Sequence, residues 1–315
     1  FYSSFVIQSQ KLIMHKTVLL NEGVENLNLK SGAILVDGTF GGGGHTLEIL
    51  RQHPEVKIIA IDQDETTLRA CKSDLLQSRQ VGLASLANQI SFYCDNFRNL
   101  DEILKKEGVK EIDGIILDLG FNSDQLASGR GFSFLKDEPL LMTFKENPQP
   151  EDLTAYDILN NWSEESLADV IYGYGEESFA KKIAANIVKA RKEGDIKTTF
   201  DLVKIIQKSV PVKFQKRKIH VATKTFQALR IAVNDELGAL KEVLEKGFIF
   251  LKSGGRMSII SFHSLEDRIV KNFYKETVKA GEATLFNKKI IIPSEKELKE
   301  NPRSRSAKLR VLEKL

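Results

Sequence analysis

Apolar residues in the N-terminal part of the chain form four short runs, each followed at once by polar residues. The runs lie at 33–37, 57–62, 90–94 and 113–118, and three of them end in aspartate. Short, nearly continuous apolar runs are typical of parallel strands that are buried on both faces. The helices expected between the first three runs lie at 46–52 and 65–78. Strands that alternate with helices in this way predict a parallel α/β sheet.

The alternation stops at about residue 122, and no strong strand pattern follows before residue 223. Helices are predicted in this region at 163–172, 176–192 and 199–207. The elements expected after it are a long amphipathic helix beginning near Thr225, a strand at 255–262, a helix at 264–276, and closing strands at 284–292 and 308–313. The pattern therefore predicts one α/β sheet that is interrupted by a mostly helical insert.

These patterns divide the chain into domains. We expect a catalytic domain formed by residues 14–122 and 224–315, and a helical insert at 123–223 that recognises the substrate. Met14 begins a stretch that resembles a natural start, so we interpret residues 1–13 as an N-terminal extension outside the fold.

Composition is ordinary for a globular enzyme, with 42% hydrophobic and 28% charged residues among 315. The two cysteines have no CxxC spacing and the five histidines form no HExxH pair, so the sequence supports neither a disulfide framework nor a metal site. No apolar run is long enough to span a bilayer. We therefore expect a cytoplasmic enzyme without a metal and without a membrane partner.

The net charge is only +3, but it is unevenly distributed. Residues 211–230 contain six basic side chains and no acidic one, and residues 287–310 contain eight basic and three acidic side chains. Such asymmetry favours an anionic partner on one face. On charge alone, a solvated lysine-rich surface is an equally good interpretation.

The glycine-rich segment from Asp37 to His45 follows the first predicted strand. Glycines at the end of a strand let the backbone approach a ligand and expose amide donors. The segment does not fit G-x-G-x-x-G and lacks the Gly-Lys-Ser/Thr of a P-loop, which disfavours NAD and nucleoside triphosphates. An acid before the glycines and another acid, Asp62, after the second strand match the arrangement in Rossmann-like methyltransferases. This pattern predicts S-adenosylmethionine as the ligand.

Three further residues at the predicted strand ends have two interpretations each. Asp62 suits a ribose diol, because a carboxylate accepts hydrogen bonds from both hydroxyls, but it could also cap the helix that begins near Glu65. Phe97, after the third strand, could flank adenine or pack in the core. Asp118, at the end of the fourth strand, could accept N–H groups from a target amine or contact only the cofactor. The sequence Asp118-Leu-Gly-Phe121 keeps the acid and the aromatic found in many exocyclic-amine methyltransferases, without their two prolines.

Seven longer motifs resemble one family. They are 37–45 (DGTFGGGGH), 130–134 (RGFSF), 174–177 (YGEE), 222–230 (ATKTFQALR), 234–237 (NDEL), 260–268 (ISFHSLEDR) and 301–310 (NPRSRSAKLR). Together, in this order, they are similar to the bacterial ribosomal RNA small-subunit methyltransferase H family, also called MraW. The resemblance extends from His15 to the C-terminus.

The resemblance implies a Rossmann-like class I methyltransferase domain with a mostly helical inserted domain. It implies N4-methylation of a cytidine in the decoding region of 16S rRNA, with S-adenosylmethionine as donor. The predicted catalytic residue is Asp118, because of its position at the strand end and the residues around it. Carried over by position, the family's cofactor contacts are Gly43, Gly44, His45, Asp62, Phe97, Asp118 and Gln125. The partner would be 16S rRNA or the small ribosomal subunit, and the protein would be a monomer or a homodimer.

With this family in view, the basic segments are interpreted as contacts to the RNA backbone, which give salt-dependent affinity. The residues predicted to make them are Lys213, Lys216, Arg217, Lys218, Arg303 and Arg305, with Lys308 and Arg310 beside them. One of the aromatic residues Phe121, Phe132 and Phe134 could receive the target base, although we expect at least two of them to be core. His263 either lines the target pocket or is structural.

Two stretches depart from the family pattern. Phe121-Asn-Ser-Asp-Gln125 replaces a small aliphatic residue followed by Ser-Ser-Pro-Gln, and Leu141 and Thr143 stand where the family has an acid and a base. Two alternatives therefore stay open: methylation of another amine, on DNA or protein, and a non-catalytic RNA-binding assembly factor. The intact glycine segment, Asp62, Asp118 and Gln125 argue against the second.

Overall fold

The computed structural model describes residues 16–77, 86–120, 123–215, 219–287 and 289–315. The chain forms two compact units. The first contains Phe1–Gly120 and Leu237–Leu315, and the second contains Phe121–Glu236. The second unit ends later than the predicted insert, at 236 instead of 223, because helix α13 (Thr223–Asn234) packs against helix α9 (Glu164–Gly175) of that unit.

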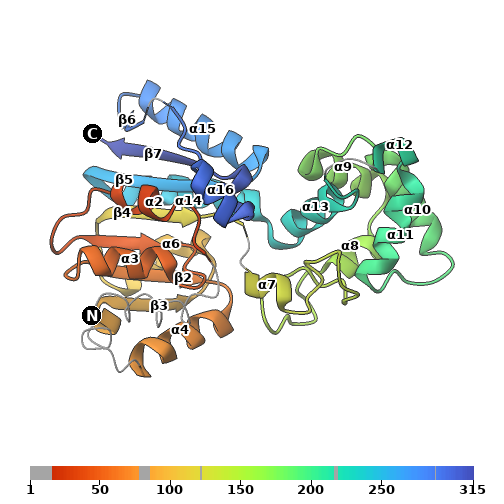
Figure 1. The fold of residues 1–315 in the computed structure, drawn as a ribbon, viewed down its shortest axis with the longest axis horizontal. Helices are drawn as coiled ribbons and strands as arrows, with labels where there is room; N and C mark the ends of the chain where they lie inside the picture. The colour runs from red at the N-terminus through yellow and green to blue at the C-terminus, as the bar shows by residue number, and fades with distance from the viewer. Residues whose placement is uncertain (1–15, 78–85, 121–122, 216–218, 288) are drawn as a thin grey trace. The chain divides into compact units, whose positions relative to one another are not determined.

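The first unit is built on a seven-stranded sheet with the order β3-β2-β1-β4-β5-β7-β6 (Figure 1). Its strands are β1 (Ile34–Asp37), β2 (Lys57–Asp62), β3 (Ile90–Cys94), β4 (Ile112–Asp118), β5 (Leu251–Ser261), β6 (Ala283–Leu285) and β7 (Lys308–Lys314). Strands β1 to β5 pair in parallel, and β7 is antiparallel to both β5 and β6. The predicted parallel α/β sheet is confirmed. Its antiparallel strand is β7, the last strand of the chain, which lies between β5 and β6.

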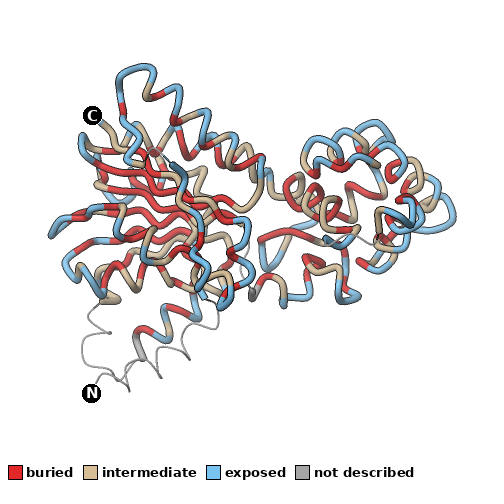
Figure 2. Tube along the Cα trace, turned by 45° about the horizontal axis from the view of Figure 1, so that its top comes forward, coloured by how far each residue is buried: buried red, intermediate tan, exposed pale blue. Residues whose placement is uncertain are grey.

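Helices cover both faces of this sheet, so successive strand residues are buried in different clusters. Val36, Ile59 and Leu117 pack with residues of α6 (Leu100–Lys106), α14 (Glu236–Phe250) and α15 (Ser264–Lys279). Their chain neighbours Leu35, Ile58 and Ile116 pack instead with α3 (Gly44–Gln52) and α4 (Glu65–Gln77). Burial on both faces explains the continuous apolar runs of the sequence, and Figure 2 shows these strands as mostly buried. The remaining elements of this unit are α2 (Leu20–Glu25), η1 (Ala87–Gln89), η2 (Phe97–Asn99), α16 (Glu295–Glu300) and η3 (Pro302–Ser306).

The second unit is helical, as predicted. Besides α9 and α13 it contains α7 (Ser123–Ala127), α8 (Ala155–Asn161), α10 (Ala180–Ala190), α11 (Thr199–Ser209) and α12 (Val212–Gln215). Its own core includes Ile158, Leu167, Ile183 and Leu202. The β pairing within its described residues is an isolated bridge between Pro139 and Thr198. A separate core shows why this unit packs as a body of its own.

Two predicted elements differ from the structure. The long helix expected from Thr225 is two helices, α13 and α14, because Asp235 adopts a left-handed conformation (φ 45°) that ends α13. The strand expected at 284–292 was wrong beyond residue 285: β6 has three residues, and Ile291 forms only an isolated bridge to Leu309. Among the described residues, no helix is both long and apolar enough to cross a bilayer.

Candidate functional site

Three aspartates lie at one edge of the sheet of the first unit, where β1, β2 and β4 end. Asp37 ends β1, Asp62 ends β2 and Asp118 ends β4. Because these strands are parallel, their carboxyl ends meet at the same edge. The glycine-rich segment leaves β1 at this edge and enters α3, as the sequence predicts.

The buried side chain of Asp37 forms hydrogen bonds at both ends of the glycine-rich segment. Its carboxylate accepts hydrogen bonds from the Thr39 main-chain N–H (3.2 Å) and from the Thr46 hydroxyl (2.7 Å). Burial raises the pKa of Asp37 to about 6, and the two hydrogen bonds oppose that shift. These two contacts bind the start of the loop, at Thr39, and the first turn of α3, at Thr46, to the same carboxylate. Asp37 therefore stabilises the conformation of the loop.

Two glycines of the segment are constrained in different ways. Gly43 has φ +75°, a conformation that residues with a side chain rarely adopt. A Cβ on Gly44 would lie 1.8 Å from Thr17 Oγ1 and 3.0 Å from Thr17 Cβ. By contrast, a Cβ on Gly42 would have no neighbour within 4 Å. The residues preceding α2 therefore lie directly against Gly44.

Asp62 connects the glycine segment to the second strand. One carboxylate oxygen accepts the Gly41 N–H (2.7 Å) and the other accepts the Asp64 N–H (2.9 Å). The side chain that caps the first turn of α4 is that of Asp64, which accepts the Thr67 N–H (3.3 Å). The capping alternative for Asp62 is thus filled by its neighbour. Burial raises the pKa of Asp62 to about 6, so its charge depends on pH near neutrality.

Asp118 and His45 lie together in a desolvated part of the site. Asp118 Oδ2 is 3.9 Å from His45 Nδ1, and the Asp118 N–H donates to Thr39 Oγ1 (2.6 Å). Within the described chain, Asp118 Oδ1 and His45 Nε2 are buried without a hydrogen-bond partner. Buried polar atoms without partners are costly. They are the atoms that a bound ligand would be expected to satisfy.

The ionisation of this pair follows from its burial. Burial lowers the pKa of His45 to about 4, partly offset by a hydrogen bond to the Val18 main chain, so the ring is neutral near pH 7. Burial also raises the pKa of Asp118 well above its usual range, and the charges of Asp37, Glu266 and Glu297 add to the effect. The close His45–Asp118 contact is therefore not an ion pair, and the site favours the approach of a cation.

The other predicted cofactor contacts occupy different places. Phe97 begins η2, and its Cβ lies 3.4 Å from the position of a Cβ on Gly38, next to the glycine segment. It also packs against a core cluster that covers one face of the sheet. Core packing of Phe97 is therefore confirmed, and its contact with adenine stays a prediction. Gln125 is buried in α7, which belongs to the second unit. Its role as a cofactor contact stays a prediction.

The residues predicted to contact RNA have varied surroundings. Arg303 and Arg305 are exposed on η3, and Lys213 is exposed on α12 with its ammonium 5.0 Å from the Phe214 ring. Lys216, Arg217 and Lys218 lie outside the described residues. Lys308 and Arg310, which were expected to contact RNA beside Arg303 and Arg305, both pair with Asp267, at 3.1 Å and 2.8 Å. These ion pairs argue against an RNA contact by either side chain.

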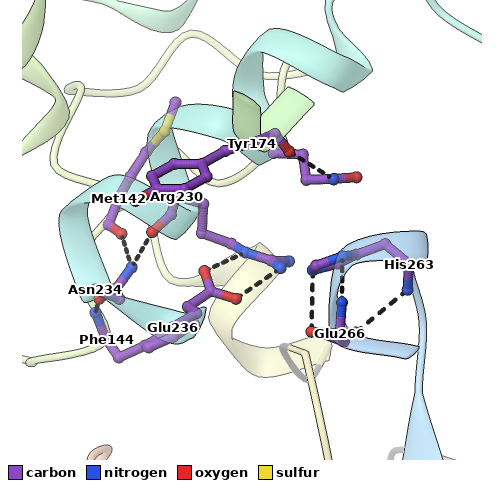
Figure 3. Close-up of polar contacts among 9 residues, drawn as sticks. Met142, Phe144, Tyr174, Arg230, Asn234, Glu236, His263 and Glu266 are labelled. Carbon is purple, nitrogen blue, oxygen red and sulfur yellow. Dashed lines mark hydrogen bonds and ion pairs between the residues drawn. The ribbon is translucent and has the colours of Figure 1, made fainter. Parts of the chain in front are cut away.

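The aromatic and histidine candidates for the target pocket are mostly structural. Phe132 stacks on Phe144 within the core of the second unit. Phe134 is half-buried against that core and stacks on the exposed His220. Phe121 lies outside the described residues. In the first unit, His263 is the N-cap of α15 and forms a reciprocal capping box with Glu266. Figure 3 shows this pair, with the His263 Nε2 3.1 Å from the Glu266 carboxylate. The structural interpretation of His263 therefore holds.

The departure at 139–144 is held through its main chain (Figure 3). Asn234 donates to the Met142 carbonyl (2.8 Å) and accepts the Phe144 N–H (2.9 Å). Met142 itself has φ 55° and donates its N–H to the Arg130 carbonyl (2.7 Å). These contacts do not depend on the side chains at 141 and 143. The loss of an acid and a base there leaves the local fold in place.

Sequence reasoning missed several residues that build the site. The hydroxyl of Thr39 accepts the Asp118 N–H, and that of Thr46 donates to Asp37. Thr39 lies inside the motif 37–45 and Thr46 directly follows it, and a hydroxyl near an acid was the available signal. The contacts of Thr17 and Val18 with Gly44 and His45 had no comparable signal, because no local pattern links these positions.

The chain is similar along most of its length to proteins of one family. Residues 12–315 match the family model described as the MraW methylase family. "Ribosomal RNA small subunit methyltransferase H" of Limosilactobacillus fermentum is 43% identical over 317 residues, covering 96% of this chain and 98% of that protein. The protein of the same name from Lactobacillus johnsonii is 44% identical, covering 96% and 99%. That from Sulfurihydrogenibium sp. is 43% identical over 300 residues, covering 95% and 99%.

Solved structures are matched at lower similarity. A putative rRNA-methylase from Clostridium thermocellum has 10% sequence identity and a TM-score of 0.46, over 96% of this chain and 100% of that one. The fold assignment therefore rests on the strand order of the sheet and not on this likeness.

Proposed function

The chain belongs to the MraW methylase family, and from that premise we propose that it methylates the N4 amine of a cytidine in the decoding region of 16S rRNA. It is a methyltransferase that depends on S-adenosylmethionine, and its relatives carry the name of a small-subunit rRNA methyltransferase. The cytidine, its position and the role of each residue are the proposed part. The exocyclic amine as target rests on one observation: at the end of β4, Asp118 has a buried oxygen, Oδ1, with no hydrogen-bond partner among the described residues.

The residues at the strand ends fit the donor. Asp118 Oδ1 and His45 Nε2 offer buried polar atoms that lack a partner in the described chain. Asp62 already accepts the Gly41 N–H, and its carboxylate has further lone pairs for ribose hydroxyls. We assign the donor to Gly43, Gly44, His45, Asp62, Phe97 and Asp118, with Gln125 of the second unit as a further contact.

Electrostatics support a positively charged donor here. When bound, S-adenosylmethionine supplies a methyl group on a cationic sulfur. His45, with a pKa of about 4, stays neutral and does not repel that charge. Asp37, Asp62 and Asp118 lie at the same edge, and a nearby cation favours their ionised forms. The site is therefore expected to bind its donor with release of protons from these carboxyl groups.

Asp118 has two proposed tasks in the transfer. Its unpartnered oxygen accepts a hydrogen bond from the exocyclic N–H, which orients the lone pair of a conjugated, weakly nucleophilic amine. Its raised pKa also lets it accept the proton that the nitrogen loses once the new N–C bond has formed. The Thr39 hydroxyl, 2.6 Å from the Asp118 N–H, fixes the main chain that carries this group.

Contacts to RNA are assigned to exposed cations. Arg303 and Arg305 on η3 and Lys213 on α12 have the exposure and charge to neutralise phosphates. Lys216, Arg217 and Lys218 are proposed to join them. The second unit, with its separate core, is proposed to recognise the substrate.

Labelled transfer tests the substrate class. The protein would be incubated with methyl-labelled donor and, in parallel, small subunits that lack the mark, free 16S rRNA, DNA and ribosomal protein. We expect label in the small-subunit RNA, and none with Asp118→Ala although that variant still folds. Label only in DNA or protein would overturn the assignment. Cofactor binding without any transfer would favour a non-catalytic assembly factor.

A further inference from the structure

Residues 16–19, which precede α2, lie against the proposed cofactor site and are called here the N-terminal segment. The Thr17 side chain fills the space beside Gly44, so that a Cβ added to Gly44 would clash with Thr17. The Val18 main chain forms a hydrogen bond with the His45 ring. Gly23, in the helix that this segment begins, is so near that a Cβ there would lie 3.1 Å from His45 Nε2. The orientation of the imidazole therefore depends on where this segment sits.

The segment is fastened to the other end of the chain. Glu297 of α16 accepts the Leu19 N–H through Oε1 at 2.9 Å, and Asn301 donates to the Lys16 carbonyl at 2.9 Å. The Lys16 and Glu300 side chains form an exposed ion pair. An exposed pair of this kind contributes little. The half-buried bond from Glu297 is charge-assisted and is the stronger of these restraints.

The main-chain conformation of Leu19 is strained, which indicates that surrounding contacts hold the N-terminal segment in place. Its φ of 48° and ψ of 39° lie in the left-handed region, which is unfavourable for a leucine. The side chain is fully buried with Val18, Leu309 and Val311. Strained conformations persist only where surrounding contacts over-determine them, and they cluster at functional sites. Here the bond to Glu297 acts on the main chain of the strained residue itself.

We infer that Glu297 is a positioning residue for the donor site: it holds the N-terminal segment at Leu19, and the segment in turn orients His45 and closes the space beside Gly44. Nothing in the sequence pattern or in the family motifs points to this residue, which is 278 positions away from its partner. The inference rests on the proposed assignment of His45 and Gly44 to the donor. It extends the site to α16, beyond the strand ends.

Binding of S-adenosylmethionine and of S-adenosylhomocysteine by isothermal calorimetry tests the inference. Glu297→Ala is expected to weaken both ligands about tenfold, to raise KM for the donor by a similar factor, and to leave kcat at saturating donor within about twofold. Glu297→Gln keeps an acceptor for the Leu19 N–H and is expected to restore most of the affinity. Glu295→Ala, exposed on the same helix, is the matched control and is expected to bind as the wild type does.

A double-mutant cycle separates positioning from a general loss of structure. If Glu297 acts through His45, Glu297→Ala has little further effect in a His45→Ala background, whereas independent effects would add. Wild-type affinity in a folded Glu297→Ala variant, or full additivity in the cycle, would overturn the inference. If wild-type protein binds neither ligand, the donor assignment itself fails, and that result is distinct from a failure of Glu297.

Discussion

Affinity for the donor is expected to fall as the pH drops through the pKa of Asp62. The proposed ribose contact needs an ionised carboxylate, because its oxygens must accept from hydroxyl groups. Burial raises the pKa of Asp62 to about 6. With that value, about 90% of the Asp62 side chains are ionised at pH 7 and about 10% at pH 5. The dissociation constant of the donor is then expected to be roughly tenfold larger at pH 5 than at pH 7, a loss of about 1.4 kcal/mol of binding free energy.

The variant Asp62→Asn tests whether this dependence belongs to Asp62. Asparagine keeps the size of the side chain and one acceptor oxygen but cannot ionise. We expect weaker binding at pH 7, since the acceptor set is reduced. With S-adenosylhomocysteine, which has no positive charge, we expect little of the tenfold change between pH 7 and pH 5, whereas the cationic donor keeps the part that comes from Asp37 and Asp118. Asp64→Asn is the matched control, because Asp64 is a buried neighbour that caps α4. Affinity should still fall with pH in this variant, but the fall should come at a lower pH, because the charge of Asp64 contributes to the raised pKa of Asp62.

Calorimetric titration at pH 5, 6 and 7 gives the dissociation constants, and circular dichroism at each pH confirms that the proteins remain folded. S-adenosylhomocysteine is titrated alongside the donor, because it carries the same ribose without the positive charge. A pH-dependent affinity for both ligands that persists in Asp62→Asn would refute the reasoning. So would a wild-type affinity that does not change between pH 5 and pH 7.

Three further changes probe the loop, the reacting carboxyl group and the RNA contacts. Gly44→Ala should lower the melting temperature and weaken donor binding, because overpacking costs about 1–3 kcal/mol, whereas Gly42→Ala, with open space around it, should do neither; equal effects in calorimetry would contradict the packing argument. Asp118→Asn should still bind S-adenosylhomocysteine but lose at least about a hundredfold in the rate of transfer, as expected for a lost acid–base group, and normal turnover in a single-turnover assay would refute both proposed roles. Reversing Arg303 and Arg305 to Glu should weaken RNA association and reduce its log–log salt slope by about 1 for each lost phosphate contact; an unchanged slope would leave them as solvated surface.

The sheet was predictable from sequence because its strands are buried on both faces. In the run 57–62, the four central residues are apolar and buried, and the last residue is an aspartate at the proposed ligand-binding edge. The break at Asp235 was not predictable, because the apolar spacing continues through it and a single left-handed residue leaves no periodic trace. The run 284–292 has strand-forming residues, but only part of it finds a partner in β7, and pairing is a property of the fold.

The site divides in the same way. Asp37, Asp62 and Asp118 were identified because strand ends are local features, and parallel strands bring them to one edge. The environment of each acid could not be predicted from the sequence, because it depends on burial and on the geometry of the loop. For example, Asp62 accepts the Gly41 N–H, and it is Asp64 that caps the first turn of α4. Glu297 was beyond reach, since its contact with Leu19 joins the two ends of the chain.

Nucleoside analysis of the methylated RNA tests the central claim most directly. Small subunits lacking the mark would be modified by the protein, their 16S rRNA digested, and the product nucleosides separated by chromatography with mass spectrometry against N4-methylcytidine and 5-methylcytidine standards. The proposal that Asp118 orients an exocyclic amine predicts N4-methylcytidine, at one position in the decoding region, and its loss with Asp118→Asn. Methylation at a ring carbon, or on another base, would contradict it.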